Sequence, residues 1–229
     1  MKVNDVAGSA REGLHAMAIG SDGTLACTWL DLRSKGTKLY LSISNDTGIS
    51  WSKNRLVYES PSGSICECCH PSLVFERSGQ LNVMFRNSFN GARDMYLTSS
   101  KDNGVTFSPA KKLGNGTWML NACPMDGGMV ASGSKGTLMT VWRRGDSVFA
   151  SSLTGEEIFM GKGAQPWGAY GTNGLYVVWV GPNGIMSLTP GGGSKETSGQ
   201  GTDPVVTSSP DHKIVFAAWA DQGIKATRL

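Results

Sequence analysis

The sequence contains no long hydrophobic run, and no run of Lys or Arg exceeds two residues. A transmembrane helix needs roughly 18–20 apolar residues, so no membrane span is expected. The lack of basic runs, with a formal net charge of only +3, argues against a nucleic-acid-binding face. Residues 1–20 lack a basic segment followed by an apolar core, so no signal peptide is expected. If Met1 stands where a leader was removed, a periplasmic or secreted location is favoured.

Proline is also scarce, whereas glycine is abundant: the 229 residues include 9 prolines and 31 glycines. Such an excess of glycine favours tight turns between short strands over helices. The five cysteines are an odd number, which excludes a fully paired disulfide framework. A chain of this length is sufficient for one domain with a sizeable core. We therefore expect an all-β fold that forms a single domain over residues 1–229.

Five segments share one pattern, in which a turn is followed by an apolar run, an aromatic residue and a polar exit. They are residues 23–29, 79–85, 136–142, 174–179 and 212–219. Their β-branched and aromatic content predicts a buried strand. Pro71, Pro166 and Pro204 each lie eight residues before one of these segments, and Pro124 fits with a longer hairpin. Proline is tolerated at the first residue of a strand, so each repeat predicts a four-stranded unit whose second strand is the shared segment.

The most specific pattern occurs twice, because residues 44–51 and 100–107 both read S-x-D-x-G-x-[ST]-[WF]. Asp46 and Asp102 are expected to accept hydrogen bonds from turn amides, with the glycine at positive φ. These turns resemble the Asp-box of sialidases and other BNR-repeat proteins. The resemblance implies a β-propeller of four-stranded blades, and it implies that both turns lie on the face opposite the ligand site.

The number of blades follows less directly, because the fifth repeat ends with its third strand at residues 223–229. We expect a five-bladed propeller in which residues 1–6 supply the missing outer strand. The alternative is an incomplete six-bladed sialidase-like propeller, since sialidases have six blades. An unpaired edge strand would favour aggregation.

Cysteines form the most unusual local feature of the predicted top face. The proline register places His70 and Cys123 at equivalent positions of adjacent blades, and in an extended segment Cys66 and Cys68 project to the same side. The expected set of metal ligands is Cys66, Cys68, Cys69, His70, Cys123 and Met125. Soft ligands of this kind select copper or zinc. A disulfide from Cys123 to Cys66 or Cys69 is the first alternative, and simple packing, as expected for Cys27, is the second.

Arginines form a second group on the predicted top-face loops. The resemblance implies a clamp of three arginines on a substrate carboxylate, which guanidinium groups bind in a bidentate manner. The expected ligand-binding residues are Arg86, Arg93, Arg143, Asn121 and Trp167. By location, Asp126 is a candidate acid and Glu67 its partner. The Arg-Ile-Pro signature of sialidases is absent, and no glutamate is clearly paired with Tyr170.

The sequence therefore supports three interpretations. The first is a sialidase-like propeller whose Cys/His/Met-rich top face binds a metal ion or another ligand. The second is an exo-glycosidase of the sialidase-like class that acts on an acidic glycan, and the third is a protein-interaction scaffold. In each case we expect a monomer whose partner is a metal, glycan, other small molecule or protein, and not a nucleic acid.

Overall fold

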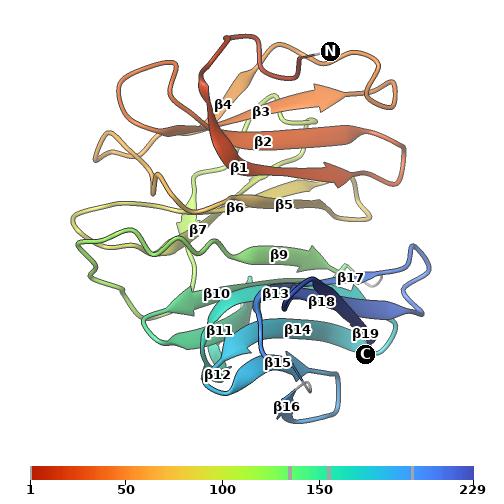
Figure 1. The fold of residues 1–229 in the computed structure, drawn as a ribbon. Helices are drawn as coiled ribbons and strands as arrows, with labels where there is room; N and C mark the ends of the chain where they lie inside the picture. The colour runs from red at the N-terminus through yellow and green to blue at the C-terminus, as the bar shows by residue number, and fades with distance from the viewer. Residues whose placement is uncertain (1, 134–135, 154–155, 197–198) are drawn as a thin grey trace. The chain divides into compact units, whose positions relative to one another are not determined.

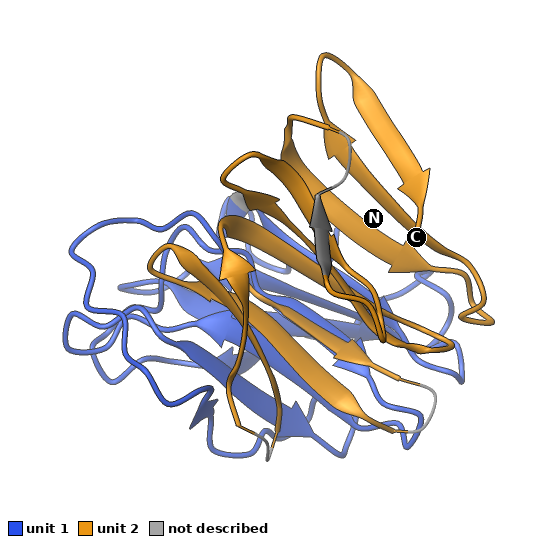
Figure 2. Ribbon diagram, turned by 90° about the horizontal axis from the view of Figure 1, so that it is seen from below, with its two compact units in different colours: residues 1–127 blue, residues 128–229 orange. Residues whose placement is uncertain are grey.

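A computed structural model of the chain describes residues 2–133, 136–153, 156–196 and 199–229 (Figure 1). All regular secondary structure in these ranges is β-strand, which confirms the all-β prediction. In this part of the chain, no helix is long and apolar enough to cross a membrane. The chain divides into two compact units, residues 1–127 and residues 128–229 (Figure 2).

The first unit contains two four-stranded antiparallel sheets in which each strand lies beside the next one in the chain. One sheet consists of β1 (Ala10–Ile19), β2 (Leu25–Asp31), β3 (Lys38–Ser44) and β4 (Arg55–Tyr58), and the other of β5 (Ser72–Phe75), β6 (Leu81–Arg86), β7 (Met95–Ser100) and β8 (Lys111–Lys112). Strands β1 and β5 contact each other. Buried side chains of both sheets, among them Leu41 and Val83, form one continuous core.

The second unit repeats this arrangement with three sheets. Their strands are β9 (Met129–Ser132), β10 (Leu138–Arg144), β11 (Ser147–Ser152) and β12 (Ile158–Lys162); β13 (Ala164–Gly171), β14 (Gly174–Gly181), β15 (Gly184–Leu188) and β16 (Ser194–Glu196); and β17 (Thr202–Ser208), β18 (Val215–Ala220) and β19 (Ile224–Arg228). Strand β14 has a buried residue on each face, because Trp179 packs toward the β9–β12 sheet and Val178 toward the β17–β19 sheet.

All five segments of the shared pattern form the predicted strands, namely β2, β6, β10, β14 and β18. The placement of two prolines differs from the prediction. Pro166 and Pro204 are the third residues of β13 and β17, and each lies in a β-bulge. The preceding residues, Gln165 and Asp203, both have a φ of 54°. A bulge leaves one residue out of the hydrogen-bond ladder, so it tolerates the missing N–H of proline inside a strand.

The two aspartate turns have the expected hydrogen bonds. Asp46 accepts bonds from the Ser50 amide at 2.8 Å and from the Ser44 hydroxyl at 2.7 Å. The Ser44 hydroxyl in turn accepts a bond from the Gly48 amide at 2.8 Å, and Gly48 has a φ of 90°. The turn around Asp102 repeats this set of bonds. The hydroxyl of the serine that begins each turn therefore accepts a hydrogen bond from the glycine amide, a contact that the sequence pattern did not predict.

The N-terminal segment differs from the prediction that residues 1–6 form an outer strand. Residue 1 lies outside the described residues, and residues 3–8 form bends and turns. Asp5 binds within the first unit, where it accepts a bond from the Asn54 amide at 3.1 Å and pairs with Arg33 at 2.8 Å. In the described part of the chain, β19 pairs only with β18. The number of blades and the single domain stay predictions.

Candidate functional site

Three cysteine sulfurs lie close together in the loop between β4 and β5. The Cys66 Sγ is 3.2 Å from the Cys69 Sγ and 3.8 Å from the Cys68 Sγ, and all three sulfurs lie within 4.8 Å of one another. Residues 67–68 form a turn, so the expectation of an extended segment is wrong. The turn brings Cys66 and Cys69 together, and the Cys66 amide fixes it by donating to the Arg86 carbonyl at 3.1 Å.

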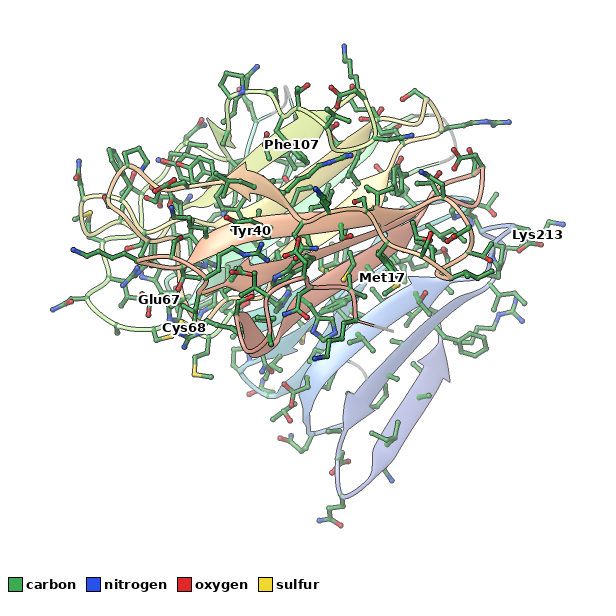
Figure 3. The ribbon with its side chains drawn as sticks, turned by 90° about the horizontal axis from the view of Figure 1, so that it is seen from above. Met17, Tyr40, Glu67, Cys68, Phe107 and Lys213 are labelled. Atoms are coloured by element: carbon green, nitrogen blue, oxygen red, sulfur yellow. A yellow bond between two sulfur atoms is a disulfide. The ribbon has the colours of Figure 1, made fainter. Side chains whose placement is uncertain are left out.

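A disulfide joins Cys68 to Cys123, with 6.2 Å between their Cα atoms. The predicted disulfide is therefore present, but the predicted partner, Cys66 or Cys69, is wrong. Those two cysteines are free thiols and each is only 1% exposed. The half-buried Cys68 lies beside Glu67 on the loop (Figure 3), and Cys123 is exposed. The bond thus ties this loop to the segment that precedes β9.

The two free thiols differ in acidity. The hydrogen bond with Cys69 lowers the pKa of Cys66 to about 7 against the effect of burial, and the charges of Arg86 and Arg93 assist. The same bond and burial raise the pKa of Cys69. Cys66 is therefore the more acidic thiol of the pair. Burial alone raises the pKa of Cys27 to about 11, in keeping with a packing role for that residue.

A pocket of about 200 Å³ opens onto this cluster. Its lining includes Cys66, both cysteines of the disulfide, Glu67 and Arg93. Arg93 contributes a buried Nε that has no hydrogen-bond partner in the described part of the chain. The pocket therefore reaches Cys66 and the disulfide, and its wall carries one positive and one negative side chain, Arg93 and Glu67.

Arg86, whose carbonyl accepts the bond from the Cys66 amide, is only 1% exposed. Its Nε donates to the Asp126 carbonyl at 3.0 Å and its Nη1 to the Arg93 carbonyl at 2.6 Å. The guanidinium also lies 5.2 Å from the centre of the Trp118 ring. Arg86 thus holds the surrounding loops together, and its predicted role in a carboxylate clamp stays a prediction.

The other predicted metal ligands have different surroundings. His70 is half-buried with its Nδ1 3.3 Å from the Pro71 carbonyl oxygen, and burial lowers its pKa. A Cβ at Gly127 would be 2.6 Å from the His70 Cε1, so only glycine leaves room for this ring. Met125 is 73% exposed. Among the described residues, the group of mutually close ligand atoms comprises the three cysteines without His70 or Cys123.

The two candidate catalytic carboxylates differ in exposure. Asp126 is 3% exposed, whereas Glu67 is exposed and accepts a bond from the Ser64 hydroxyl at 2.9 Å. The Glu67 carboxylate also lies 4.0 Å from the Arg11 guanidinium. Their assignment as a catalytic pair stays a prediction.

The remaining predicted ligand-binding residues lie apart from the cysteine loop in the sequence. Asn121 is exposed in the first unit. Arg143 and Trp167 belong to the second unit. The Arg143 Nε donates to the Gly145 carbonyl at 2.7 Å, and Arg143 lines a pocket of about 350 Å³ with Asp146 and Lys162. Trp167 packs against the core between the β13–β16 and β17–β19 sheets.

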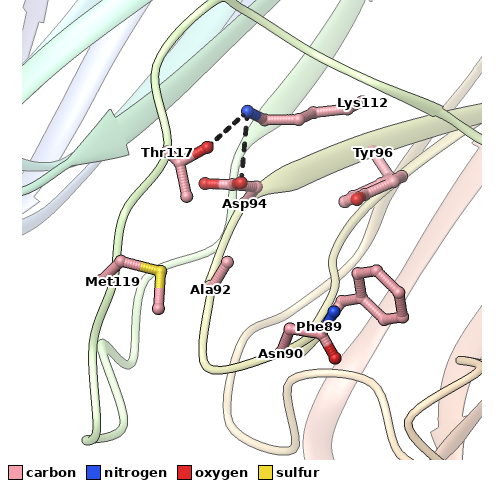
Figure 4. A pocket seen from close by; sticks show the side chains of 8 residues that line it. All are labelled: Phe89, Asn90, Ala92, Asp94, Tyr96, Lys112, Thr117 and Met119. Atoms are coloured by element: carbon pink, nitrogen blue, oxygen red, sulfur yellow. Dashed lines mark hydrogen bonds and ion pairs between the residues drawn. The ribbon is translucent and has the colours of Figure 1, made fainter.

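A further pocket of about 300 Å³, which the sequence analysis missed, lies in the first unit (Figure 4). Phe89, Tyr96 and Met119 line it together with an ion pair in which Lys112 lies 3.4 Å from the buried Asp94. These residues come from three separate segments without a common spacing. No local signal in the sequence could therefore have identified this pocket.

Residues 6–141 match a family model described as a BNR repeat-like domain. This match covers more than half of the chain, which therefore belongs to the BNR repeat-like family. No curated protein matches the sequence.

Solved structures with a similar fold include sialidases. The Hadza microbial sialidase Hz136 matches with a TM-score of 0.61 and 15% identity, over 96% of this chain and 56% of that one. A mutant of the NanB sialidase from Streptococcus pneumoniae matches with a TM-score of 0.61 and 10% identity, over 95% and 60%. AofleA from Arthrobotrys oligospora matches with a TM-score of 0.58 and 11% identity, over 98% and 74%.

These identities are low, so the likeness concerns the fold alone. The chain spans less than two thirds of the length of both sialidases. The fold is that of a sialidase-like β-propeller, as the two aspartate turns predicted.

Proposed function

We propose that this protein is a sialidase-like propeller that binds a soft metal ion, copper(I) foremost and zinc second, through Cys66 and Cys69. The observation that carries the proposal is the pair of buried free thiols, whose sulfurs lie 3.2 Å apart. Thiolate sulfur is the ligand that copper(I) and zinc prefer. Two free cysteines in one turn need only small side-chain rotations to hold one ion between them.

The surroundings of the two thiols support the same proposal. Metal binding requires deprotonated sulfur, so the site gains negative charge when it forms. Arg86 and Arg93 place positive charge near Cys66 and offset part of that gain. The adjacent pocket of about 200 Å³ offers access from solvent. We propose this two-sulfur site in place of the larger set that also includes His70 and Met125.

Copper(I) competition with a chromogenic chelator, carried out on the whole chain, tests the proposal. We expect one copper(I) per chain, with affinity at least about 100-fold lower in Cys66→Ser and Cys69→Ser, because even residues that only support a ligand contribute 10–100-fold. Cys27→Ser is the matched control and retains the affinity of the unchanged protein, since Cys27 is buried in β2 away from the pocket lining. Equal affinities in the unchanged protein and in the Cys66→Ser/Cys69→Ser double variant would refute the proposal.

An acidic-glycan exo-glycosidase is the second candidate, and the buried Arg93 Nε without a partner supports it. An acidic sugar would supply the missing acceptor, with Asp126 and Glu67 as the candidate acid and its partner. Fluorogenic sialosides and neutral glycosides test this candidate. The glycosidase hypothesis predicts turnover of an acidic substrate that falls at least about 100-fold in Arg93→Ala. Removal of one hydrogen-bond donor to the transition state has an effect of this size in other enzymes. No turnover with any member of the panel rejects it.

A further inference from the structure

The disulfide removes from the cysteine cluster the sulfur that lies next to the two free thiols. The Cys68 Sγ is 3.8 Å from the Cys66 Sγ, but it is bonded to Cys123. We propose that this disulfide controls the metal site: its reduction frees Cys68 to become the third sulfur ligand, and its formation withdraws that ligand. The inference rests on the proposed metal site at Cys66 and Cys69.

The positions of the three sulfurs fit one ion without rearrangement of the backbone. With metal–sulfur bonds of about 2.3 Å, the three sulfurs of a trigonal site lie roughly 4 Å apart. The observed separations are 3.2 Å and 3.8 Å, and no pair exceeds 4.8 Å. All three cysteines belong to one turn, whereas Cys123 comes from a distant part of the chain. Breaking the disulfide therefore leaves the three-sulfur turn intact and releases only Cys123.

A reductant can reach this bond. Cys68 and Cys123 both line the pocket, Cys123 is exposed and Cys68 is half-buried. Exposed disulfides are the labile class, in contrast to buried structural ones. Exchange with a small dithiol transfers two electrons and two protons to the protein, yielding the Cys68 and Cys123 thiols and the oxidised dithiol. The metal then displaces the proton of the Cys68 thiol as it binds.

The coupling acts in both directions. If reduction raises the affinity for the metal by some factor, the bound metal favours the reduced form by the same factor. The site would thus hold a soft ion tightly under reducing conditions and release it when the disulfide forms.

Two variants that remove the same disulfide separate its effect on the metal from its effect on stability. Cys123→Ser leaves Cys68 free, whereas Cys68→Ser removes the third sulfur and keeps Cys66 and Cys69. Cadmium(II) is the probe, because it does not change redox state and its bonds to thiolate absorb in the ultraviolet. The oxidised and dithiol-reduced forms of the unchanged protein complete the set.

We expect the reduced protein and Cys123→Ser to bind cadmium(II) at least about 10-fold more tightly than the oxidised protein and Cys68→Ser. The reason is that the loss of even a residue that only supports a metal ligand lowers metal affinity about 10–100-fold. In the reduced protein and Cys123→Ser, we expect the charge-transfer absorbance of three bound thiolates. In the oxidised protein and Cys68→Ser, we expect that of two. Equal affinities and absorbances in Cys123→Ser and Cys68→Ser overturn the control by the disulfide while the two-sulfur site stands. Failure of the reduced protein to bind cadmium(II) or copper(I) overturns the proposed function itself.

Discussion

At the scale of single residues, Asp31 is a buried charge outside the candidate site that is stabilised by its hydrogen bonds. Asp31 ends β2 and is only 1% exposed. Its carboxylate accepts bonds from the Ser9 hydroxyl at 2.8 Å, the Trp29 indole at 2.7 Å and the Arg33 Nε at 2.9 Å. Burial raises its pKa, but the bonds from Arg33, Trp29 and Ser9 outweigh this effect and lower the pKa to about 2. A buried carboxylate with this many partners stabilises the loop and needs no catalytic role.

Asp31→Asn tests this account through its dependence on pH. Because the pKa of Asp31 is lower in the folded chain than in the unfolded chain, its contribution is complete above about pH 4 and is lost as the pH falls toward 2. We expect the variant to lose about 2 kcal/mol of the free energy of unfolding at pH 7 and to show a weaker dependence between pH 4 and 2. Urea unfolding at several pH values measures both effects. Asp221→Asn, in a surface bend, is the control; an equal loss in that variant contradicts the account.

Among the elements, β13 and β17 begin with a feature that the sequence analysis did not detect. Glycines precede their bulges at equivalent positions, Gly163 before β13 and Gly201 before β17, with φ of 146° and 150°. A Cβ at Gly163 would lie 2.1 Å from the Val180 carbonyl oxygen, and one at Gly201 would lie 2.5 Å from that of Ala220. Each glycine thus lets the chain cross closely over the end of the next strand. The repeat therefore includes backbone contacts as well as the shared apolar strand.

Gly163→Ala is expected to destabilise the protein by about 2 kcal/mol or more, because the Cβ meets backbone, which cannot move aside as a flexible side chain can. Gly193→Ala is the matched control, since a Cβ there has no atom within 4 Å. That variant should remain within about 0.5 kcal/mol of the unchanged protein. Thermal unfolding of both variants measures the difference, and equal midpoints would show that the close approach at Gly163 is unimportant.

At the scale of the whole molecule, the five described sheets all place neighbouring strands in chain order. This regularity follows from the repeats, because each repeat is one meander that buries its apolar faces against adjacent sheets within its unit. The family match and the similar propellers agree with this architecture. The complete cysteine cluster lies within the first unit, so the proposed metal site depends on one pair of sheets and their loops.

The sequence by itself determined the five shared strands, their place as the second strand of each sheet and the two aspartate turns, because these depend on neighbouring residues and on periodic patterns that the chain repeats. It also identified Cys66, Cys69 and Arg93 as candidates, because unusual residue types are visible without coordinates. Only the tertiary structure decided that Cys123 pairs with Cys68 and that Cys66 faces Cys69. Those facts depend on the conformation of a turn and on the approach of segments 55 residues apart, which no local pattern encodes.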